Sequence, residues 1–188
     1  MFYLVSTSPR RKKILKSLRI RFRALTPGYE EKNSSKSTPS GLVKKHALAK
    51  ARSVLEKITA GTVLAADTIV YFRRKIIGKP KSMKEAARIL ARLQGNWHTV
   101  YTGVAIFKIR KGRVGKKVIY CEKTKVHLEK MTRRDILAYF KRVDPLDKAG
   151  AYAIQSKRSA IVDSVKGSLS NAVGLPLESF KKYLSMIK

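Results

Sequence analysis

A serine, a proline and two arginines follow the short apolar segment 2–5, and these residue types suit the binding of an anion. Ser8 can cap the first turn of a helix, because its hydroxyl accepts a hydrogen bond from a free N–H group there. Pro9 fits the first helical position, where its missing N–H costs nothing. Arg10 and Arg11 put two cations at a helix end whose dipole favours an anion. The segment therefore predicts either a phosphate site at a helix start or a capped helix with a solvated basic face.

One carboxylate interrupts the apolar segment 63–70. Asp67 stands in the middle of it, where a carboxylate is costly unless it is paired, hydrogen-bonded or bound to a metal. Groups in such positions tend to have shifted pKa values and to belong to functional sites. Asp67 is therefore interpreted as a functional carboxylate, and the alternative is a structural carboxylate neutralised by a nearby basic side chain.

Two further short motifs carry groups suited to phosphate chemistry. Glu30 and Glu31 are the only adjacent acids, and they could supply an oxygen ligand to Mg²⁺ or stand in a solvated turn. Lys79 lies in the rigid turn Gly78-Lys79-Pro80. The sequence has neither a G-x-x-x-x-G-K-[ST] phosphate loop nor a G-x-G-x-x-G motif. Phosphate binding would therefore depend on dispersed side chains and on helix ends.

The charge balance is strongly basic, with 43 Lys and Arg against 12 Asp and Glu and a formal net charge of +31. Such a charge suits nucleic acid, an anionic membrane surface or a polyphosphate substrate, and it also fits a proteome with a basic bias. The basic residues are spread along the chain and form no block-like tail. A nucleic-acid-binding protein is therefore the rival class, although no RNA-binding signature is present.

The 188 residues fit a single domain over 1–188, or two lobes that share a core. One cysteine, Cys121, excludes an internal disulfide framework and a cysteine-based zinc site. The three histidines are far apart in sequence and show no metal spacing. The sequence shows no secretory signal and no apolar run of about 18 residues, so we expect a cytoplasmic protein with no membrane partner.

Strand and helix signals mix without regular alternation. Strands are expected at 2–5, 22–25, 62–72, 97–109, 114–128 and 159–165, and helices at 42–58, 82–93, 132–143, 175–187 and from Pro9 onward. The polar segment 29–41 reads as an exposed loop. Hairpin turns at 73–75 and 111–112 imply antiparallel pairs, so the sequence predicts an α/β fold with a mixed sheet.

Seven motifs, in this order, resemble those of the Maf family of nucleoside triphosphate pyrophosphatases. They are Ser6-Thr7-Ser8-Pro9-Arg10-Arg11, Glu30-Glu31, Lys50-Ala51, Ala66-Asp67-Thr68-Ile69-Val70, Gly78-Lys79-Pro80, Asp147-Lys148-Ala149-Gly150-Ala151-Tyr152-Ala153-Ile154-Gln155 and Val173-Gly174-Leu175-Pro176. The resemblance covers essentially the whole chain. It implies a strongly twisted mixed sheet with flanking helices and two lobes around a central cleft, as in the ITPase-like fold.

The resemblance also implies an activity. Members of the family hydrolyse a nucleoside triphosphate between its α- and β-phosphates, with Mg²⁺ or Mn²⁺ as cofactor, and release a monophosphate and pyrophosphate. They are thought to clear non-canonical nucleotides, are linked to arrest of cell division, and are often dimeric. A homodimer is therefore expected here.

The family's functional residues carry over by motif. Asp67 takes the place of the proton acceptor, and Glu30 and Asp67 take the places of metal ligands, with Glu31 as the alternative to Glu30. The phosphate-contacting positions fall on Ser8, Arg10, Arg11, Lys50 and Lys79. One helix departs from the family pattern x-Leu-Ala-x-x-Lys-Ala, because it reads Lys45-His46-Ala47-Leu48-Ala49-Lys50-Ala51 and still keeps Lys50 in register.

Three positions separate the family's substrate subgroups. Arg10, Thr68 and Gln155 match the members that prefer dTTP and UTP, whereas members that prefer 7-methyl-GTP carry other residues there. The resemblance therefore implies a dTTP/UTP pyrophosphatase, and a pyrophosphatase for another modified nucleotide is the runner-up. A weak nonspecific affinity for nucleic acid is also expected from the charge.

Overall fold

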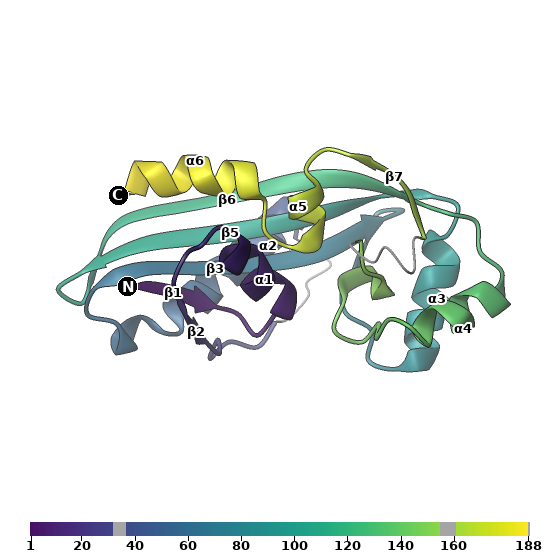
Figure 1. Cartoon of the computed structure of the whole chain (residues 1–188), viewed down its shortest axis with the longest axis horizontal. Helices are drawn as coiled ribbons and strands as arrows, with labels where there is room; N and C mark the ends of the chain where they lie inside the picture. Colours follow the sequence, from purple (N-terminus) through teal and green to yellow (C-terminus); the bar gives the residue numbers. More distant parts are fainter. Residues whose placement is uncertain (32–36, 155–160, 188) are drawn as a thin grey trace.

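The computed structural model describes residues 1–31, 37–154 and 161–187. Within these residues seven strands form one sheet in the order β2-β1-β3-β5-β6-β7, and β4 pairs with β3 off this path (Figure 1). The strands are β1 (Phe2–Val5), β2 (Arg23–Leu25), β3 (Gly61–Phe72), β4 (Lys75–Ile77), β5 (Trp97–Arg110), β6 (Arg113–Leu128) and β7 (Val162–Lys166). β1 runs parallel to β2 and β3, and the other pairs are antiparallel. The predicted mixed sheet is confirmed.

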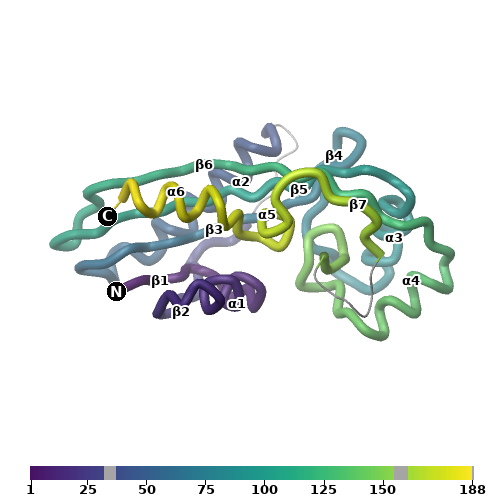
Figure 2. The backbone as a smooth tube through the Cα atoms, turned by 45° about the horizontal axis from the view of Figure 1, so that its top comes forward, coloured from purple at the N-terminus to yellow at the C-terminus, as the bar shows by residue number. Residues whose placement is uncertain are grey.

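Helices cover both faces of this sheet. They are α1 (Pro9–Ser17), α2 (Pro39–Arg52), α3 (Met83–Leu93), α4 (Arg133–Phe140), α5 (Leu169–Val173) and α6 (Leu177–Ile187), with 3₁₀ turns η1 (Leu55–Lys57) and η2 (Ala149–Ala151). α2 packs on one face of β3 and β5, and α1 and α6 pack on the other (Figure 2). α3, α4 and η2 gather around one end of the long strands and share a separate apolar cluster there.

The side chains of β3 alternate between these two layers. Val63 and Ala65 belong to the cluster under α2, whereas Leu64 and Ala66 belong to the cluster under α1 and α6. Because the period of a strand is two, the next two side chains continue the alternation. Asp67 therefore lies on the α2 side of the sheet, and Thr68 lies on the α1 side.

The ends of several elements differ from the sequence prediction. The helix predicted at 42–58 begins at Pro39, because Thr38 caps it by accepting a hydrogen bond from the Gly41 N–H at 3.2 Å, and it ends at Arg52. The last turn of that prediction is the separate element η1. The predicted closing helix begins at Leu177, and the short helix α5, capped by Ser168, was not predicted. Residues 159–160 of the predicted strand 159–165 lie outside the described residues.

Candidate active site

A cavity of about 670 Å³ lies beside the start of α1. Its lining comes from the β1–α1 connection and the first turn of α1, Pro27 and Glu31, α2, β3, Val100 of β5, the turn after β4 and the segments 147–154 and 172–173. The lining includes, among the predicted site residues, Ser8, Arg10, Arg11, Lys50, Asp67, Thr68 and Lys79. Residues from distant parts of the sequence therefore meet in the cleft that the family resemblance implies.

Asp67 is the centre of a buried charged cluster in this cavity. The residue is 3% exposed, its Oδ1 accepts a hydrogen bond from the Lys50 Nζ at 2.7 Å, and its Oδ2 lies 3.0 Å from the His46 Nδ1. Lys50 also forms an ion pair with Glu31. Burial alone would raise the pKa of Asp67, but the His46 hydrogen bond and the Lys50 charge outweigh it and hold that pKa well below its ordinary value.

Helix α2 brings two of its polar side chains to Asp67 from one face. His46 and Lys50 are four residues apart, so they lie one turn above the other. The helix can approach the sheet closely because Gly103 pairs with Asp67 in the β3–β5 ladder. A Cβ at Gly103 would lie 2.3 Å from the backbone carbonyl of Val43 in α2.

The donor atoms in this cluster could hold a metal ion. One ligand atom from each of Glu31, His46 and Asp67 lies within 4.8 Å of the others. Carboxylate oxygens are the ligands that Mg²⁺ and Mn²⁺ prefer, and the Lys50 ammonium already pairs with both carboxylates, so the position accepts a cation. Glu30, the ligand implied by the family motif, is exposed and belongs neither to this group nor to the cavity lining.

Arg11 is held on the α1 side by protein acceptors. Its Nε donates to the Gly174 carbonyl at 2.8 Å, its Nη1 to the Ser6 Oγ at 3.3 Å and its Nη2 to the Thr68 Oγ1 at 2.9 Å. Burial lowers the pKa of Arg11, and the nearby charge of Asp67 opposes that shift. Arg11 therefore ties the start of α1 to β3 and to the turn before α6.

Arg10 reaches the segment that follows α4. Its Nη1 donates to the Asp147 Oδ2 at 2.7 Å and its Nη2 donates to the Asp147 carbonyl at 3.0 Å. Asp147 also forms an ion pair with Lys148. Desolvation raises the pKa of Asp147, but the hydrogen bonds from Lys148 and Arg10 together lower it below its ordinary value. Arg10 therefore bridges two sides of the cavity through a carboxylate.

The remaining predicted site residues have simpler surroundings. Ser8 is the N-cap of α1, with its Oγ 3.5 Å from the Arg11 N–H, as predicted. Lys79 is exposed at the cavity edge, in the turn after β4. Gln155 lies outside the described residues.

A comparison with known families agrees with this geometry. The family model described as "Maf-like protein" matches residues 1–187. The chain belongs to the Maf family. A protein of Gloeobacter violaceus named dTTP/UTP pyrophosphatase is 42% identical to this Maf-family chain over 174 residues, which are 93% of this chain and 89% of that protein. A Bacillus anthracis protein of the same name is 41% identical over 181 residues, 96% of this chain and 92% of that protein.

Solved structures with a similar fold come from a different set of proteins. The Staphylococcus aureus Ham1 protein has a TM-score of 0.54 at 11% identity, covering 100% of this chain and 99% of its own. A HAM1 protein from Coxiella burnetii has a TM-score of 0.55 at 14% identity, covering 98% of both chains. At these identities the likeness supports the fold alone, and the predicted ITPase-like fold is confirmed.

Two residues of this Maf-family site, His46 and Thr102, are not predicted as functional from the sequence. The distance of His46 from the other histidines indicates no metal site, although its position four residues before Lys50 on a helix is a usable signal. Thr102, which is fully buried and hydrogen-bonded to Thr68, had no sequence signal because it reaches the site only through the β3–β5 pairing. Among the described residues, no helix has the length and apolar character needed to cross a bilayer.

Proposed function

We propose that this Maf-family protein hydrolyses dTTP and UTP between the α- and β-phosphates and releases the monophosphate and pyrophosphate. The observation that carries the proposal is the buried carboxylate of Asp67, paired with Lys50 and facing a cavity whose edges supply further cations. The names of the relatives support the same activity. They also favour an enzyme over a nucleic-acid-binding protein.

The basic side chains of the cavity would bind the triphosphate. Arg10, Lys79, Lys81 and Lys148 are among the residues that line it. Phosphoryl transfer depends mainly on positioning and on neutralising charge, which cations in a partly enclosed cavity do well. Arg11, whose three nitrogens already donate to protein groups, would act mainly by holding the start of α1 in place.

A divalent ion, Mg²⁺ or Mn²⁺, fits the acidic side of the cavity. Asp67 and Glu31 would hold it, and His46 would keep the Asp67 carboxylate oriented. The bound ion would neutralise phosphate charge and lower the pKa of a nearby water. Asp67 is ionised at neutral pH because its pKa is low, so it can accept a proton only from a water made more acidic than usual.

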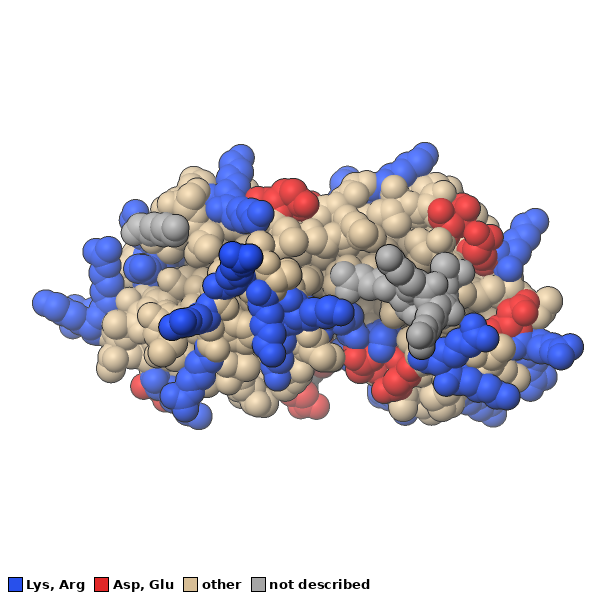
Figure 3. All heavy atoms as spheres, in the orientation of Figure 1, with Lys and Arg blue, Asp and Glu red and all other residues tan. Residues whose placement is uncertain are grey.

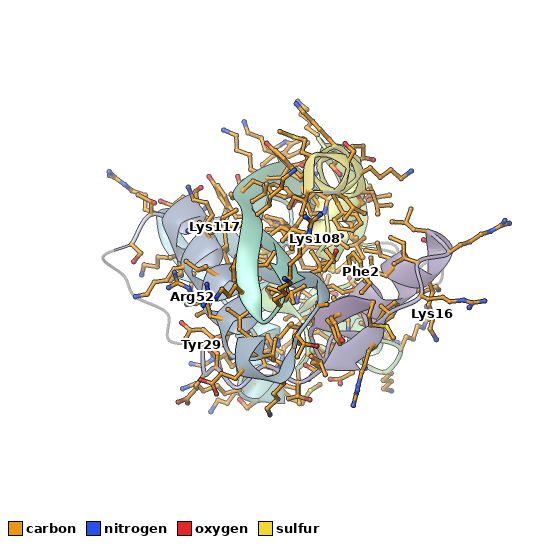
Figure 4. All side chains as sticks on the ribbon, turned by 90° about the vertical axis from the view of Figure 1, so that its left-hand side faces the viewer. Phe2, Lys16, Tyr29, Arg52, Lys108 and Lys117 are labelled. Atoms are coloured by element: carbon orange, nitrogen blue, oxygen red, sulfur yellow. The ribbon has the colours of Figure 1, made fainter. Side chains whose placement is uncertain are left out.

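The excess positive charge is not concentrated at the proposed site. Figure 3 shows Lys and Arg side chains scattered over one whole face of the molecule. Figure 4 shows Lys16 and Arg52 on opposite sides of one end. A basic stripe with stacking aromatics would indicate nucleic acid as the main ligand, and this scatter indicates at most a weak nonspecific affinity. A homodimer and a cytoplasmic location remain predictions.

Pyrophosphate release from a panel of nucleoside triphosphates tests the proposal. We expect activity with dTTP and UTP, which depends on a divalent metal, and a loss of at least about a hundredfold in Asp67→Asn. Asp163→Asn makes the same chemical change at an exposed position of β7, outside the cavity lining, and should retain wild-type activity. Equal activity in Asp67→Asn and the wild type, or preferred hydrolysis of 7-methyl-GTP, would contradict the proposal.

A further inference from the structure

Four side chains on the α1 side of the sheet form a buried hydrogen-bond network beneath Thr68. The Thr68 Oγ1 lies 3.0 Å from the Thr102 Oγ1, and the Thr102 Oγ1 donates to the backbone carbonyl of Asn171 in α5 at 3.0 Å. A second threonine, Thr124, donates to the Ser168 carbonyl at 2.8 Å and accepts from the Asn171 Nδ2 at 2.9 Å. Thr102, Thr124 and Asn171 are at most 1% exposed.

The donor and the acceptor of each hydrogen bond between Thr68, Thr102 and Asn171 can be assigned. A carbonyl oxygen only accepts, so the single hydroxyl proton of Thr102 is used on Asn171. The Thr68–Thr102 hydrogen bond must then be donated by Thr68. The Arg11 Nη2 donates to the same Thr68 oxygen at 2.9 Å. The Thr68 hydroxyl therefore donates its proton to Thr102 and accepts from Arg11, and one lone pair is left to accept a hydrogen bond from a ligand.

Thr68 lines the cavity, whereas Thr102 behind it is fully buried. We propose that Thr102 fixes the Thr68 hydroxyl as an obligate hydrogen-bond acceptor, so that the cavity selects a nucleotide base with a donor at this point: the N3–H of uracil or thymine. Cytosine presents a lone pair at N3, and two acceptors facing each other in a buried site repel. This inference rests on the proposed function and adds Thr102 to it as a positioning residue.

The base, rather than the sugar, is the part of the nucleotide that suits this end of the cavity. Val100, Ala172 and Val173 are apolar lining residues, and all three belong to β5 or to α5, which carry the network. The flat faces of nucleotide bases pack against such surfaces, whereas phosphates require the cations at Arg10 and Lys79. An acceptor set among apolar groups discriminates strongly, because a ligand without the matching donor leaves it unpaired.

Thr102→Val tests the inference, because valine keeps the shape of threonine and removes the acceptor for the Thr68 proton. The freed proton can turn toward cytosine N3. We expect the ratio of kcat/KM for UTP to that for CTP to fall about tenfold or more, equivalent to ~1.4 kcal/mol. The binding ratio of UMP to CMP, measured by calorimetry, should fall in parallel, and Thr102→Ser should restore both ratios.

Thr124→Val is the matched control. It removes a buried hydroxyl from the same network and the same helix contact, but it leaves the Thr68–Thr102–Asn171 hydrogen bonds in place. We expect it to lower the melting temperature as Thr102→Val does and to leave the UTP/CTP and UMP/CMP ratios unchanged. In the wild type, 3-methyl-UMP, which has no N3–H, should bind at least about tenfold more weakly than UMP.

Three results would overturn the inference. One is an unchanged ratio in folded Thr102→Val, and another is an equal change in Thr124→Val. The third is normal binding of 3-methyl-UMP with weak binding of 2′,3′-dideoxy-UMP, which would assign the donor to the sugar. The binding measurements with UMP and CMP also test the two proposals separately. A preference for UMP over CMP without any pyrophosphate release would contradict the proposed hydrolysis and would still support the acceptor role of Thr68.

Discussion

Gly103 lies directly opposite Asp67 in the β3–β5 ladder, and its missing side chain is what lets helix α2 reach that carboxylate. A Cβ there would stand 2.3 Å from both the carbonyl carbon and the carbonyl oxygen of Val43. His46 and Lys50 follow Val43 on the same helix and contact Asp67 at 3.0 and 2.7 Å. The spacing between two backbones therefore determines the geometry of the charged cluster.

Gly103→Ala should push α2 away from the sheet. We expect a loss of stability of about 1–3 kcal/mol from overpacking, and a fall in kcat of at least about tenfold because Lys50 and His46 move relative to Asp67. Urea unfolding gives the first number and pyrophosphate release gives the second. Gly115→Ala in β6 is the control, because its nearest neighbour would be the Lys108 carbonyl at an ordinary 3.7 Å. A fully active Gly103→Ala protein would contradict this account.

Glu31 and Glu30 differ in their relation to the charged cluster, although they are adjacent in sequence. Both are exposed, but Glu31 pairs with Lys50 and lines the cavity, whereas Glu30 lies outside the lining. We expect Glu31→Gln to weaken Mn²⁺ binding about tenfold or more and Glu30→Gln to change it less than about twofold. Electron paramagnetic resonance of free Mn²⁺ during titration measures this without nucleotide. The opposite order would return the ligand role to Glu30, as the family motif implies.

The sequence predicted most of the site's members but not how they are joined. Ser8 was predicted as a helix cap and Asp67 as a functional carboxylate, because each depends on its immediate neighbours in the chain. The contacts of Arg10 with Asp147 and of Thr68 with Thr102 depend on residues 137 and 34 positions away. Local patterns contain no information about such pairs. The family resemblance assigns both Arg10 and Thr68 to the substrate, whereas the structure adds a protein partner for each.

The Arg10–Asp147 ion pair competes with the proposed role of Arg10 in phosphate binding. Asp147 places a negative charge where a triphosphate would approach, and both side chains are partly exposed, at 26% and 38%. We expect Asp147→Asn to lower the KM for UTP about two- to fivefold at low salt, with kcat within about twofold, because a partly exposed pair is worth up to about 1 kcal/mol. The effect should shrink at 0.5 M salt, where screening is strong.

Asp144→Asn is the control for this prediction. It removes the same charge from the same loop, where the Asp144 Oδ1 accepts a hydrogen bond from the Leu146 N–H, and Asp144 is not among the residues that line the cavity. We expect its KM to stay near the wild-type value. An equal fall in KM for both variants would mean that the long-range charge, and not the contact with Arg10, is responsible.

His98 should make the protein less stable in mild acid. The residue is 3% exposed, its Nε2 lies 2.7 Å from the Tyr152 hydroxyl, and burial lowers its pKa from 6.5 to about 4. The unfolded chain therefore takes up a proton on this histidine below pH 6.5, while the folded protein does so only near pH 4. The contribution of neutral His98 to the free energy of unfolding is fully present above pH 6.5 and is lost as the pH falls from 6.5 to 4. By pH 4.5 this residue alone should lower the free energy of unfolding by about 2–3 kcal/mol.

Urea unfolding of the wild type and of His98→Asn at pH 7.5 and 4.5 measures that contribution. The wild-type difference between the two pH values should exceed the difference in His98→Asn by about 2–3 kcal/mol, whatever the variant's own stability at pH 7.5. His127→Asn changes a less buried histidine, whose Nδ1 lies 2.8 Å from the Asp163 Oδ2, and should keep most of the wild-type difference. If His98→Asn showed the wild-type pH dependence, a residue other than His98 would be responsible for the loss in acid.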